Sequence, residues 1–503
     1  MAEQNNDQDK KPDSIEPVHS VRSAGQGYID AMASNQLVVE QAIEDIGMGR
    51  YQWWLLVSCG FGFLVDQILL ILVTVIMPNS AKEFGPKYQT LLTASLYAGL
   101  FVGALFCGIA ADLLGRKMVW QLSIFGAAIF TLLMASSPNW GALNAWVALT
   151  GLFAGGNLAI DLTVLAESLP RTWSFLLTGL ACTWGLGSAI TALISWPVVV
   201  NFCCPNGSDP STCSKFQNMG WRYIQIILGG LCLLMAIARS LVLGMHESPR
   251  WLVSQGRVDD AVTALNRISS TNKVEYTVAI IGQFCDIPAD QIPKRSWMGE
   301  IESIRELFVG RRKIRLMVCL ILLWGLVGIC YPLYNVFLPY YLAAHGADLG
   351  DGSNYQTYRD LAVSSVVGIF GPLLSAFMVR LKKPHLGHKG TICITAAICA
   401  IFAGLFTEVR TEGQNIAFSC MVNFWLNALY AVVYAYTPAS LKTRHRGTGC
   451  GMLMACGRLV SICAPFIATF GDVTSGTPLF VSCAMYVCMG LLGVALPTLE
   501  AGA

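Results

Sequence analysis

The chain has 503 residues, of which 54% are hydrophobic and only 13% are charged. Soluble proteins carry roughly 25% charged residues, so this composition, with a mean hydropathy of +0.55, argues against a soluble protein and indicates a chain built mainly of membrane helices. The net charge of +2 gives no reason to expect nucleic acid as a partner.

The N-terminal region differs from the rest of the chain in being polar. Residues 1–50 contain no apolar core segment, so we expect no cleavable signal peptide there. The stretch 2–40 is rich in Gln, Asp, Asn and Ser, a composition typical of disorder. We therefore expect residues 1–50 to form a disordered cytosolic tail, and residues 498–503 to form a short cytosolic tail at the other end.

Apolar segments of spanning length fill most of the remaining chain. A membrane-spanning helix needs about 20 apolar residues, and the polar stretch 245–315 divides the segments into two sets of six. We predict an all-α membrane protein with a six-helix bundle over 51–244, a cytosolic central loop with short helices over 245–315, and a second six-helix bundle over 316–497. Trp196-Pro197 is expected to bend the fifth span. The twelve spans are expected at about 52–77, 88–111, 118–137, 141–168, 174–202, 221–244, 316–344, 358–379, 391–408, 415–438, 447–470 and 478–497.

The lysines and arginines predict the orientation, because cytosolic loops carry an excess of them. With the N-terminus inside, the inward loops hold most of these residues, also when the long central loop is left out. Both termini are therefore expected in the cytosol, and the plasma membrane is the expected location. The outward loop 203–220 then carries the glycosylation sequon Asn206-Gly-Ser208 and the cysteines Cys203, Cys204 and Cys213, among which we expect one disulfide.

A short polar hinge lies between the second and third spans. It reads Gly108-Ile-Ala-Ala-Asp112-Leu-Leu-Gly115-Arg116-Lys117. The glycines let two helices approach closely, and the charged side chains can clamp neighbouring helices in one conformation and release them in another. Such a hinge points to a transporter, and it resembles the loop between helices 2 and 3 of the major facilitator superfamily.

Further motifs extend this resemblance over about residues 41–497. They resemble the synaptic-vesicle-glycoprotein-related and organic-ion transporter branch, especially its fungal members, with some motifs shared with sugar porters. The stretches are Ala42-Ile-Glu-Asp-Ile-Gly-Met-Gly-Arg-Tyr-Gln-Trp53, Glu167-Ser-Leu-Pro-Arg171, Glu247-Ser-Pro-Arg-Trp-Leu252, Tyr436-Thr-Pro-Ala-Ser-Leu441 and Arg444-His-Arg-Gly-Thr-Gly449, followed by Arg458.

The resemblance implies two pseudosymmetric bundles that work by alternating access, with no cofactor and as a monomer in the lipid bilayer. The chain lacks the paired glutamines of sugar porters in span 7 and the Gly-Pro-x-x-Gly-Gly element of drug antiporters in span 5. Ala439 also stands where the family has a glutamate. The chain therefore fits neither a standard sugar porter nor a standard drug antiporter.

Polar residues within the first six spans indicate where a solute or a proton binds. Asp66, beside Gln67, lies near the middle of span 1, where an aspartate costs about 2.5–3.5 kcal/mol. It handles solute or protons, or it forms a structural ion pair with Arg239 or Arg458. Asn157 and Asp161 share one face of span 4, and we expect Asp161 to face a central cavity, whereas Glu167 joins Arg171 in a cytosolic gate.

The second half offers a matching set of polar side chains. Asn423, Asn427, Tyr430 and Tyr434 form one stripe on span 10, expected either to face the cavity or to hydrogen-bond between helices. Tyr331, Tyr334 and Asn335 form a similar cluster in span 7 around Pro332, which breaks a backbone hydrogen bond. Arg458, halfway through span 11, binds an anionic solute or neutralises Asp66 or Asp161.

These residues predict a secondary active transporter that moves a small polar or ionisable organic solute by alternating access, with protons as the expected coupling ion. All histidines lie in loops or at span ends, so a carboxylate has to carry any coupled proton. Export of a fungal-type metabolite and a non-transporting sensor or partner protein remain alternatives. We find no phosphate-binding loop, no paired metal ligands and no nucleophile motif, so we expect neither an enzyme nor a metal site. The expected cytosolic gate consists of Asp112, Arg116, Glu167, Arg171, Glu247, Arg250, Arg444 and Arg446.

Overall fold

The computed structural model is helical throughout the part of the chain that it describes. This part comprises residues 18–205, 208–241, 246–274, 284–285, 304–344, 353–381, 387–441, 446–470 and 477–497, and no strand occurs within it. Eleven helices there are long and apolar enough to cross a membrane, and the apolar helix Leu479–Ala495 stands in place of the twelfth expected span. The all-α membrane fold predicted from the sequence is therefore confirmed.

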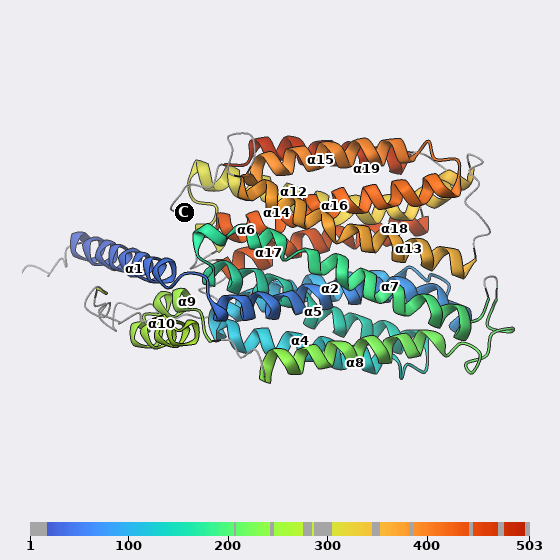
Figure 1. Ribbon diagram of the computed structural model, residues 1–503, viewed down its shortest axis with the longest axis horizontal. Helices are drawn as coiled ribbons and strands as arrows, with labels where there is room; N and C mark the ends of the chain where they lie inside the picture. The colour runs from blue at the N-terminus through green and yellow to red at the C-terminus, as the bar shows by residue number, and fades with distance from the viewer. Residues whose placement is uncertain are drawn as a thin grey trace, which may run out of the picture.

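The first half of the chain forms one bundle, drawn in blue to green in Figure 1. A polar side chain begins its helix Trp140–Ser168, where the Asn139 side chain accepts a hydrogen bond of 2.9 Å from the Ala142 N–H. The helices are α2 (Arg50–Phe84), α3 (Leu91–Leu114), α4 (Arg116–Met134), α5 (Trp140–Ser168), the 3-10 turn η1 (Arg171–Trp173), α6 (Phe175–Gly179), α7 (Cys182–Phe202) and α8 (Gly220–Leu241).

The second half forms a matching bundle, drawn in yellow to red. Its helices are α12 (Arg311–Ala344), α13 (Asn354–Gly368), α14 (Phe370–Arg380), α15 (Gly387–Phe406), α16 (Glu412–Ser440), α17 (Arg446–Ser461), α18 (Cys463–Phe470) and α19 (Thr477–Ala495). The short helices α9 (Pro249–Ser254) and α10 (Val258–Asn272) lie between the halves in sequence, and α1 (Val18–Ile46) precedes them all.

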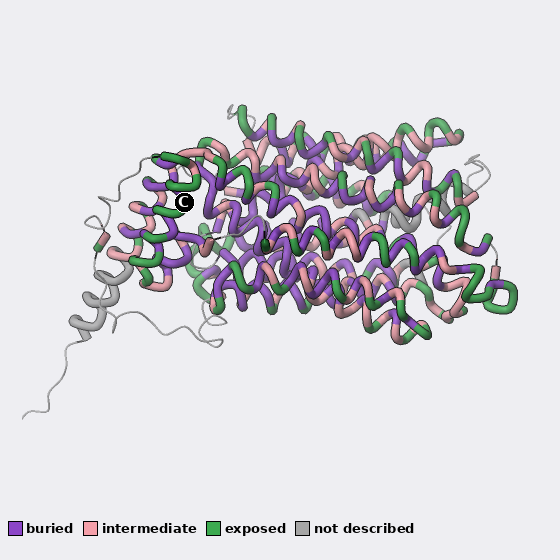
Figure 2. The backbone as a smooth tube through the Cα atoms, turned by 60° about the horizontal axis from the view of Figure 1, so that its bottom comes forward, coloured by how far each residue is buried: buried purple, intermediate pink, exposed green. Residues whose placement is uncertain are grey.

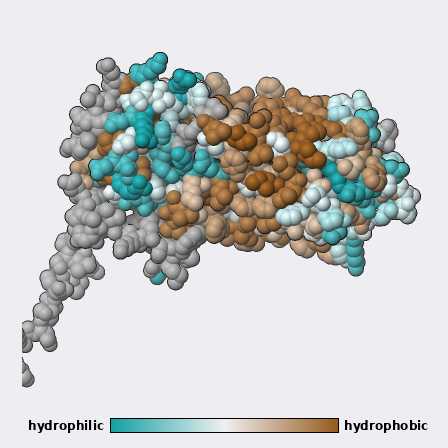
Figure 3. All heavy atoms as spheres, turned by 90° about the horizontal axis from the view of Figure 1, so that it is seen from below, coloured by the Kyte–Doolittle hydropathy of each residue, from teal (hydrophilic) through white to brown (hydrophobic). Residues whose placement is uncertain are grey.

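The bundle has two distinct ends. α1, α9 and α10 gather at one end, which we call the terminal end (Figure 1). The loop between α7 and α8 lies at the opposite end, which we call the disulfide end. Between them, buried residues follow the inner sides of the helices (Figure 2), and a hydrophobic belt separates two more hydrophilic ends (Figure 3). Such a belt is the surface expected of a protein embedded in lipid.

The structure differs from the sequence expectation at the N-terminus. Residues 18–46, expected within a disordered tail, form α1. The reason is a periodic apolar face at its end, where Val39, Ala42, Ile43 and Ile46 recur at helical spacing and are all buried. The polar composition of the first forty residues concealed this face.

Three expected spans are interrupted at places that the sequence did not indicate: the fifth, the eighth and the eleventh, the last of which breaks at Ile462, between α17 and α18. The fifth span breaks at Leu180–Ala181, between α6 and α7, while Pro197 lies inside α7. The eighth span breaks at Ile369, between α13 and α14. Pro372 explains the second break, because a proline has no N–H to donate to the carbonyl four residues earlier, here that of Gly368.

Candidate functional site

A cavity of about 520 Å³ lies between the two halves. Helices α2, α3 and α7 line it from the first half, and α12, α13, α16 and α17 line it from the second. Hydroxyl and amide groups dominate its polar wall: Gln67, Thr74, Thr93, Tyr97, Ser188, Thr357, Tyr358, Ser364, Ser365, Ser419, Asn423, Asn427, Tyr430, Tyr434 and Ser461. Three charged residues, Asp66, Asp360 and Arg458, also line it.

Asp66 and Arg458 form an ion pair across this cavity. A carboxylate oxygen of Asp66 lies 3.6 Å from a guanidinium nitrogen of Arg458, and their side chains are only 4% and 16% exposed. Asp66 comes from α2 and Arg458 from α17, so the pair joins the two halves. Of the two arginines considered as partners for Asp66, the structure therefore places Arg458 beside it.

Three aromatic rings form the floor of the cavity toward the terminal end. Tyr434 packs edge-on against both Trp184 and Trp324, with ring centroids 4.5 Å apart in each case. On their helices, these are the cavity residues nearest to the terminal end. The Trp324 indole donates to the Thr437 hydroxyl at 3.0 Å, whereas the buried Trp184 indole N–H has no hydrogen-bond partner among the described residues.

The polar stripe on α16 lines the cavity and also bonds to neighbouring helices. Asn427 donates to the Gly368 carbonyl at 3.3 Å, the group that Pro372 leaves without a helical donor. Tyr430 donates to the Val327 carbonyl at 3.1 Å. Both readings of the stripe therefore describe part of its geometry. The side chains of Tyr331, Tyr334 and Asn335 lie outside the part of the chain that the structure describes.

A side chain also replaces a missing backbone donor in α12, where Pro332 lines the cavity. Pro332 cannot donate to the Gly328 carbonyl, and the Ser461 hydroxyl of α17 donates to it instead, at 2.6 Å. In both helices a neighbouring side chain replaces the missing backbone donor, which membrane helices with proline require.

Asn157 and Asp161 differ from the expectation, because they do not line the cavity. Both are buried within the first half, where Asp161 forms an ion pair with Arg239 of α8. Trp120 donates to Asp161 at 2.5 Å, and Asn157 accepts a bond of 2.9 Å from Arg239. The spacing of these residues showed that they share a helix face but not which neighbour that face meets.

Gly62 allows α2 to pack against this buried ion pair. A Cβ atom at Gly62 would lie 1.7 Å from a carboxylate oxygen of Asp161, a separation that no real structure tolerates. Gly62 lies one turn before Asp66 on α2, so the close packing against Asp161 also fixes the turn that carries Asp66. The Asp161–Arg239 pair thus helps to position Asp66, although neither residue of the pair lines the cavity.

The charged motif residues form a network at the terminal end. Arg116 pairs with Asp112 at 3.0 Å and with Glu167 at 3.2 Å, and all three side chains are buried. The second carboxylate oxygen of Asp112 accepts bonds from the backbone N–H and the hydroxyl of Thr448, each at 2.7 Å. Since Thr448 lies in the first turn of α17, this network links the two halves.

Further members of the expected gate surround this network. Glu247 accepts bonds of 3.2 Å from the backbone N–H groups of Arg116 and Lys117, and burial raises the pKa of its carboxyl group. Arg446 donates to the Leu441 carbonyl at 3.1 Å. Arg444 lies outside the described residues.

Arg171, expected in one gate with Glu167, pairs with a residue outside the expected gate. It pairs with Glu40 of α1 rather than with Glu167, and its backbone N–H donates to Glu44. Glu167 is bound by Arg116 instead. Sequence analysis placed Glu40 and Glu44 in a disordered tail and therefore did not consider them as partners of Arg171.

Glycines allow α3 and α17 to meet directly at the terminal end. A Cβ atom at Gly451 would lie 2.6 Å from the Ala104 carbonyl oxygen and 2.9 Å from the Gly108 Cα atom. The backbones of the two halves therefore touch beside the Asp112–Thr448 link. The terminal end is closed here, and the cavity occupies the region from the aromatic floor toward the disulfide end.

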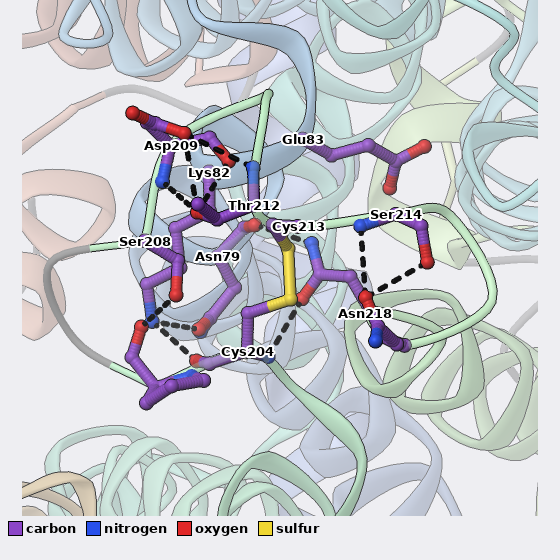
Figure 4. Close-up of a disulfide and its surroundings, with 12 residues drawn as sticks. Asn79, Lys82, Glu83, Cys204, Ser208, Asp209, Thr212, Cys213, Ser214 and Asn218 are labelled. Carbon is purple, nitrogen blue, oxygen red and sulfur yellow. Dashed lines mark hydrogen bonds between the residues drawn. A yellow bond between two sulfur atoms is a disulfide. The ribbon is translucent and has the colours of Figure 1, made fainter.

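At the disulfide end, the loop between α7 and α8 is fixed by the Cys204–Cys213 disulfide (Figure 4). The Asn218 side chain donates to the Asn79 carbonyl at 2.8 Å, and the Asn79 side chain donates to the Tyr358 hydroxyl of α13 at 3.1 Å. Of the three cysteines considered from the sequence, Cys203 is the free one. Asn206 lies outside the described residues.

Sequence analysis missed several residues of the site. Trp184 and Trp324 were not singled out, because tryptophan is ordinary in a membrane helix. Ser364 and Ser365 lie on α13, where the spacing of one turn between Asp360 and Ser364 would have indicated a polar face. Glu40 was assigned to a disordered tail.

Comparisons with known proteins agree with this architecture. The family model described as Major Facilitator Superfamily matches residues 55–465. The chain is 34% identical to MFS siderochrome iron transporter 1 of Ceriporiopsis subvermispora over 92% of this chain and 89% of that protein. It is 26% identical to Niacin transporter NiaP of Acinetobacter baylyi over 85% of this chain and 89% of that protein.

The fold also matches a solved structure. The proton:xylose symporter XylE superposes with a TM-score of 0.64 at 17% identity, covering 88% of this chain and 94% of that one. The resemblance drawn from the sequence motifs, including the synaptic-vesicle-glycoprotein-related branch, is confirmed. The chain therefore belongs to the major facilitator superfamily and is a multi-pass membrane transporter, not an enzyme.

Proposed function

We propose that this transporter couples the movement of a small ionisable organic solute to the movement of a proton, and the Asp66–Arg458 pair in the cavity carries the proposal. The Arg458 guanidinium can pair with the Asp66 carboxylate or with an anionic group of the solute. A proton bound by Asp66 removes the competing negative charge, so Arg458 becomes available to the solute. Proton and solute then bind together and leave together. This change of partner at Arg458 couples the movement of the solute to that of the proton.

The cavity wall supports a small polar solute. Its volume of about 520 Å³ falls within the roughly 300–1,000 Å³ typical of small-molecule pockets. Ser364, Ser365 and Asn423 offer hydroxyl and amide groups to a solute's polar atoms, while the floor of Trp184, Trp324 and Tyr434 offers flat apolar contact. A small organic acid with one planar face fits both features.

The two named relatives transport different solutes, and one suits the cavity better. Niacin is a small aromatic carboxylic acid, so its ring matches the aromatic floor and its carboxylate matches Arg458. A siderochrome carries a bound iron ion and is much larger. The proposed solute class is therefore small organic anions of the niacin type.

We also propose that the terminal end faces the cytosol, since the short loops at that end carry most of the loop lysines and arginines. The proposed location is the plasma membrane. The network around Asp112 and Arg116 acts as the gate of the cytosolic side. It closes in the conformation described here and separates when the two halves rock to expose the cavity to the cytosol.

The test uses purified protein in liposomes with a pH difference across the membrane. Accumulation of radiolabelled niacin and other small organic acids should follow the proton gradient, and Asp66→Asn should abolish gradient-driven accumulation while exchange of solute persists. The matched control is Asp260→Asn, which removes an exposed acid of α10. Uptake that ignores both the gradient and Asp66→Asn would contradict proton coupling.

The same assay separates the other functions considered. Movement of no solute across the membrane, with binding intact, indicates a sensor. Profiling of metabolites inside and outside cells with and without the protein shows whether it imports a nutrient or exports a metabolite.

A further inference from the structure

Arginines from both halves converge at the terminal end. Arg171 comes from η1, Arg250 from α9 between the halves, and Arg446 from α17 of the second half. Arg116 also lies here, but Asp112 and Glu167 already bind it. Burial lowers the pKa of the Arg250 guanidinium, and the positive charge of Arg446 lowers it further. The convergence is therefore repulsive unless another acid faces these arginines.

Glu40 of α1 is that acid. Its carboxylate pairs with Arg171 and lies 3.8 Å from a guanidinium nitrogen of Arg250. Its negative charge also acts on Arg446, as does that of Glu167. One side chain from outside both six-helix bundles thus pairs with arginines of the first half and of the central segment, and its charge also acts on an arginine of the second half.

Packing and hydrogen bonds hold α1 in the position that presents Glu40. The buried face of Val39, Ala42, Ile43 and Ile46 lies on the same helix turns as Glu40. The Asn35 side chain and the Cys285 backbone exchange two hydrogen bonds, of 2.8 and 3.0 Å.

α1 is also tied to α9. The Gln36 side chain donates to the Arg250 carbonyl at 2.8 Å. Arg250 is thus held twice by α1, through its carbonyl by Gln36 and through its guanidinium by Glu40. Figure 1 shows α1 beside α9 and α10 at the terminal end. The helix is therefore a docked element whose placement does not depend on the ion pairs alone.

We propose that α1 is a working part of the terminal-end gate and that Glu40 is its positioning residue. Glu40 neutralises Arg171 and Arg250, which allows α17, with Arg446 in its first turn, to close against α3. Without that charge the arginines of the two halves repel one another, and the closed terminal end loses stability relative to the open one. The inference rests on the proposed opening and closing of this end, but not on the solute or on proton coupling.

Cys450 provides a native probe of this closure. It is fully buried on α17, one turn after Arg446, and it lies beside Thr163 of α5, across the junction between the halves. Its thiol reacts with a maleimide only when the junction opens. Cys399 on α15 is equally buried but lies within the second half, so it reports unfolding rather than gating.

The experiment measures alkylation of both cysteines by N-ethylmaleimide in full-length protein in lipid nanodiscs, resolved by peptide mass spectrometry. No solute is added. Glu40→Gln should speed alkylation of Cys450 at least about threefold and leave Cys399 unchanged. Asp260→Asn, which removes an acid from the exposed Arg257–Asp260 pair of α10, should change neither rate.

A Cys450 rate in Glu40→Gln equal to that of the unmodified protein overturns the proposal. If Cys399 also reacts faster, the charge-balanced variant Glu40→Gln with Arg171→Gln decides. Restored protection of Cys450 in that variant supports a charge-based gate, and continued exposure rejects it. The experiment measures no transport, so its outcomes can be interpreted even if the proposed proton coupling proves wrong.

Discussion

One carboxylate oxygen of Asp112 accepts two hydrogen bonds from Thr448, from its backbone N–H and from its hydroxyl, each at 2.7 Å. Asp112 lies near the end of α3 and Thr448 in the first turn of α17, so this contact joins the halves. A negative charge at a helix N-terminus is stabilised by about 0.3–1 kcal/mol at exposed positions and by more where water is excluded. Asp112 is fully buried, so the link is strong for a contact that the proposed gate has to break in each cycle.

The glycine contact beside this link should be intolerant of a single methyl group. Gly451→Ala places a Cβ atom 2.6 Å from the Ala104 carbonyl oxygen, so α3 and α17 have to separate. Overpacking of this kind costs about 1–3 kcal/mol. We expect faster hydrogen–deuterium exchange in the first turns of α17, measured by mass spectrometry on protein in nanodiscs.

The matched control for that substitution is Gly404→Ala on α15, where the added Cβ atom meets nothing within 4 Å. It should leave exchange in α17 unchanged. Equal exchange in the two variants would show that the backbone contact does not hold the terminal end closed.

Removal of Arg116 should slow the transport cycle more than it weakens solute binding. Arg116→Ala leaves the buried acids Asp112 and Glu167 without their cation, and such a loss costs about 3–5 kcal/mol. Arg116 does not line the cavity, so the site that meets the solute is intact. Initial uptake rates over a range of solute concentrations should show a lower maximal rate at a nearly constant KM.

The control for this measurement is Arg257→Ala, which breaks an exposed ion pair on α10 and should change neither constant, since such pairs contribute little. A maximal rate in Arg116→Ala equal to that of the unmodified protein would remove the network from the gate.

The sequence predicted the membrane fold well because the relevant signals are local. The length of an apolar segment is set by the bilayer, so Leu91–Leu114 and Trp140–Ser168 could be placed within a few residues of the structure. Helix breaks were harder to predict. Pro372 interrupts its span, whereas Pro197 and Pro332 lie inside the continuous helices α7 and α12, so a proline in the sequence does not by itself predict a break.

The site was only partly predictable, because a helix sequence gives a face but not its neighbour. Asp66 and the stripe of Asn427 do line the cavity, whereas Asp161 turns into the first half toward Arg239. The sequence spacing of Asp161 does not show whether its helix face meets the cavity or another helix of the first half. Glu40 could not be assigned to the gate, since its partner Arg171 lies 131 residues away.

The Asp161–Arg239 pair should prove structural, unlike the pair in the cavity. Either Asp161→Asn or Arg239→Gln leaves one buried charge without a partner, at a cost of about 3–5 kcal/mol. The double variant removes both charges and should recover most of the melting temperature lost in each single variant. The measurement is thermal unfolding in detergent, with Asp66→Asn as the comparison that loses coupling but melts at nearly the normal temperature.

A different result for Asp161→Asn would contradict a purely structural role of this pair. Normal melting of Asp161→Asn together with loss of proton-driven uptake would assign Asp161 to coupling despite its burial behind Gly62. Such a result would mean that protons reach the interior of the first half.

The unpartnered indole of Trp184 should contribute to solute affinity. Its N–H is buried at the floor of the cavity without an acceptor among the described residues, which is costly unless an acceptor arrives with the solute. Trp184→Phe keeps an aromatic ring against Tyr434 but removes the donor. A hydrogen bond to a charged group contributes about 1.5–3 kcal/mol, so KM should rise by roughly tenfold or more, while the melting temperature stays the same or rises.

Trp324→Phe is the matched comparison for this last variant, since it removes the indole N–H of a second floor residue, one that already donates to Thr437 at 3.0 Å. Its loss leaves the Thr437 hydroxyl without that donor, so the melting temperature should fall while KM changes little. Opposite responses of the two tryptophans, one in affinity and one in stability, distinguish a donor held ready for the solute from one that holds helices together. An unchanged KM in Trp184→Phe would mean that the solute binds above the aromatic floor and never takes that hydrogen bond.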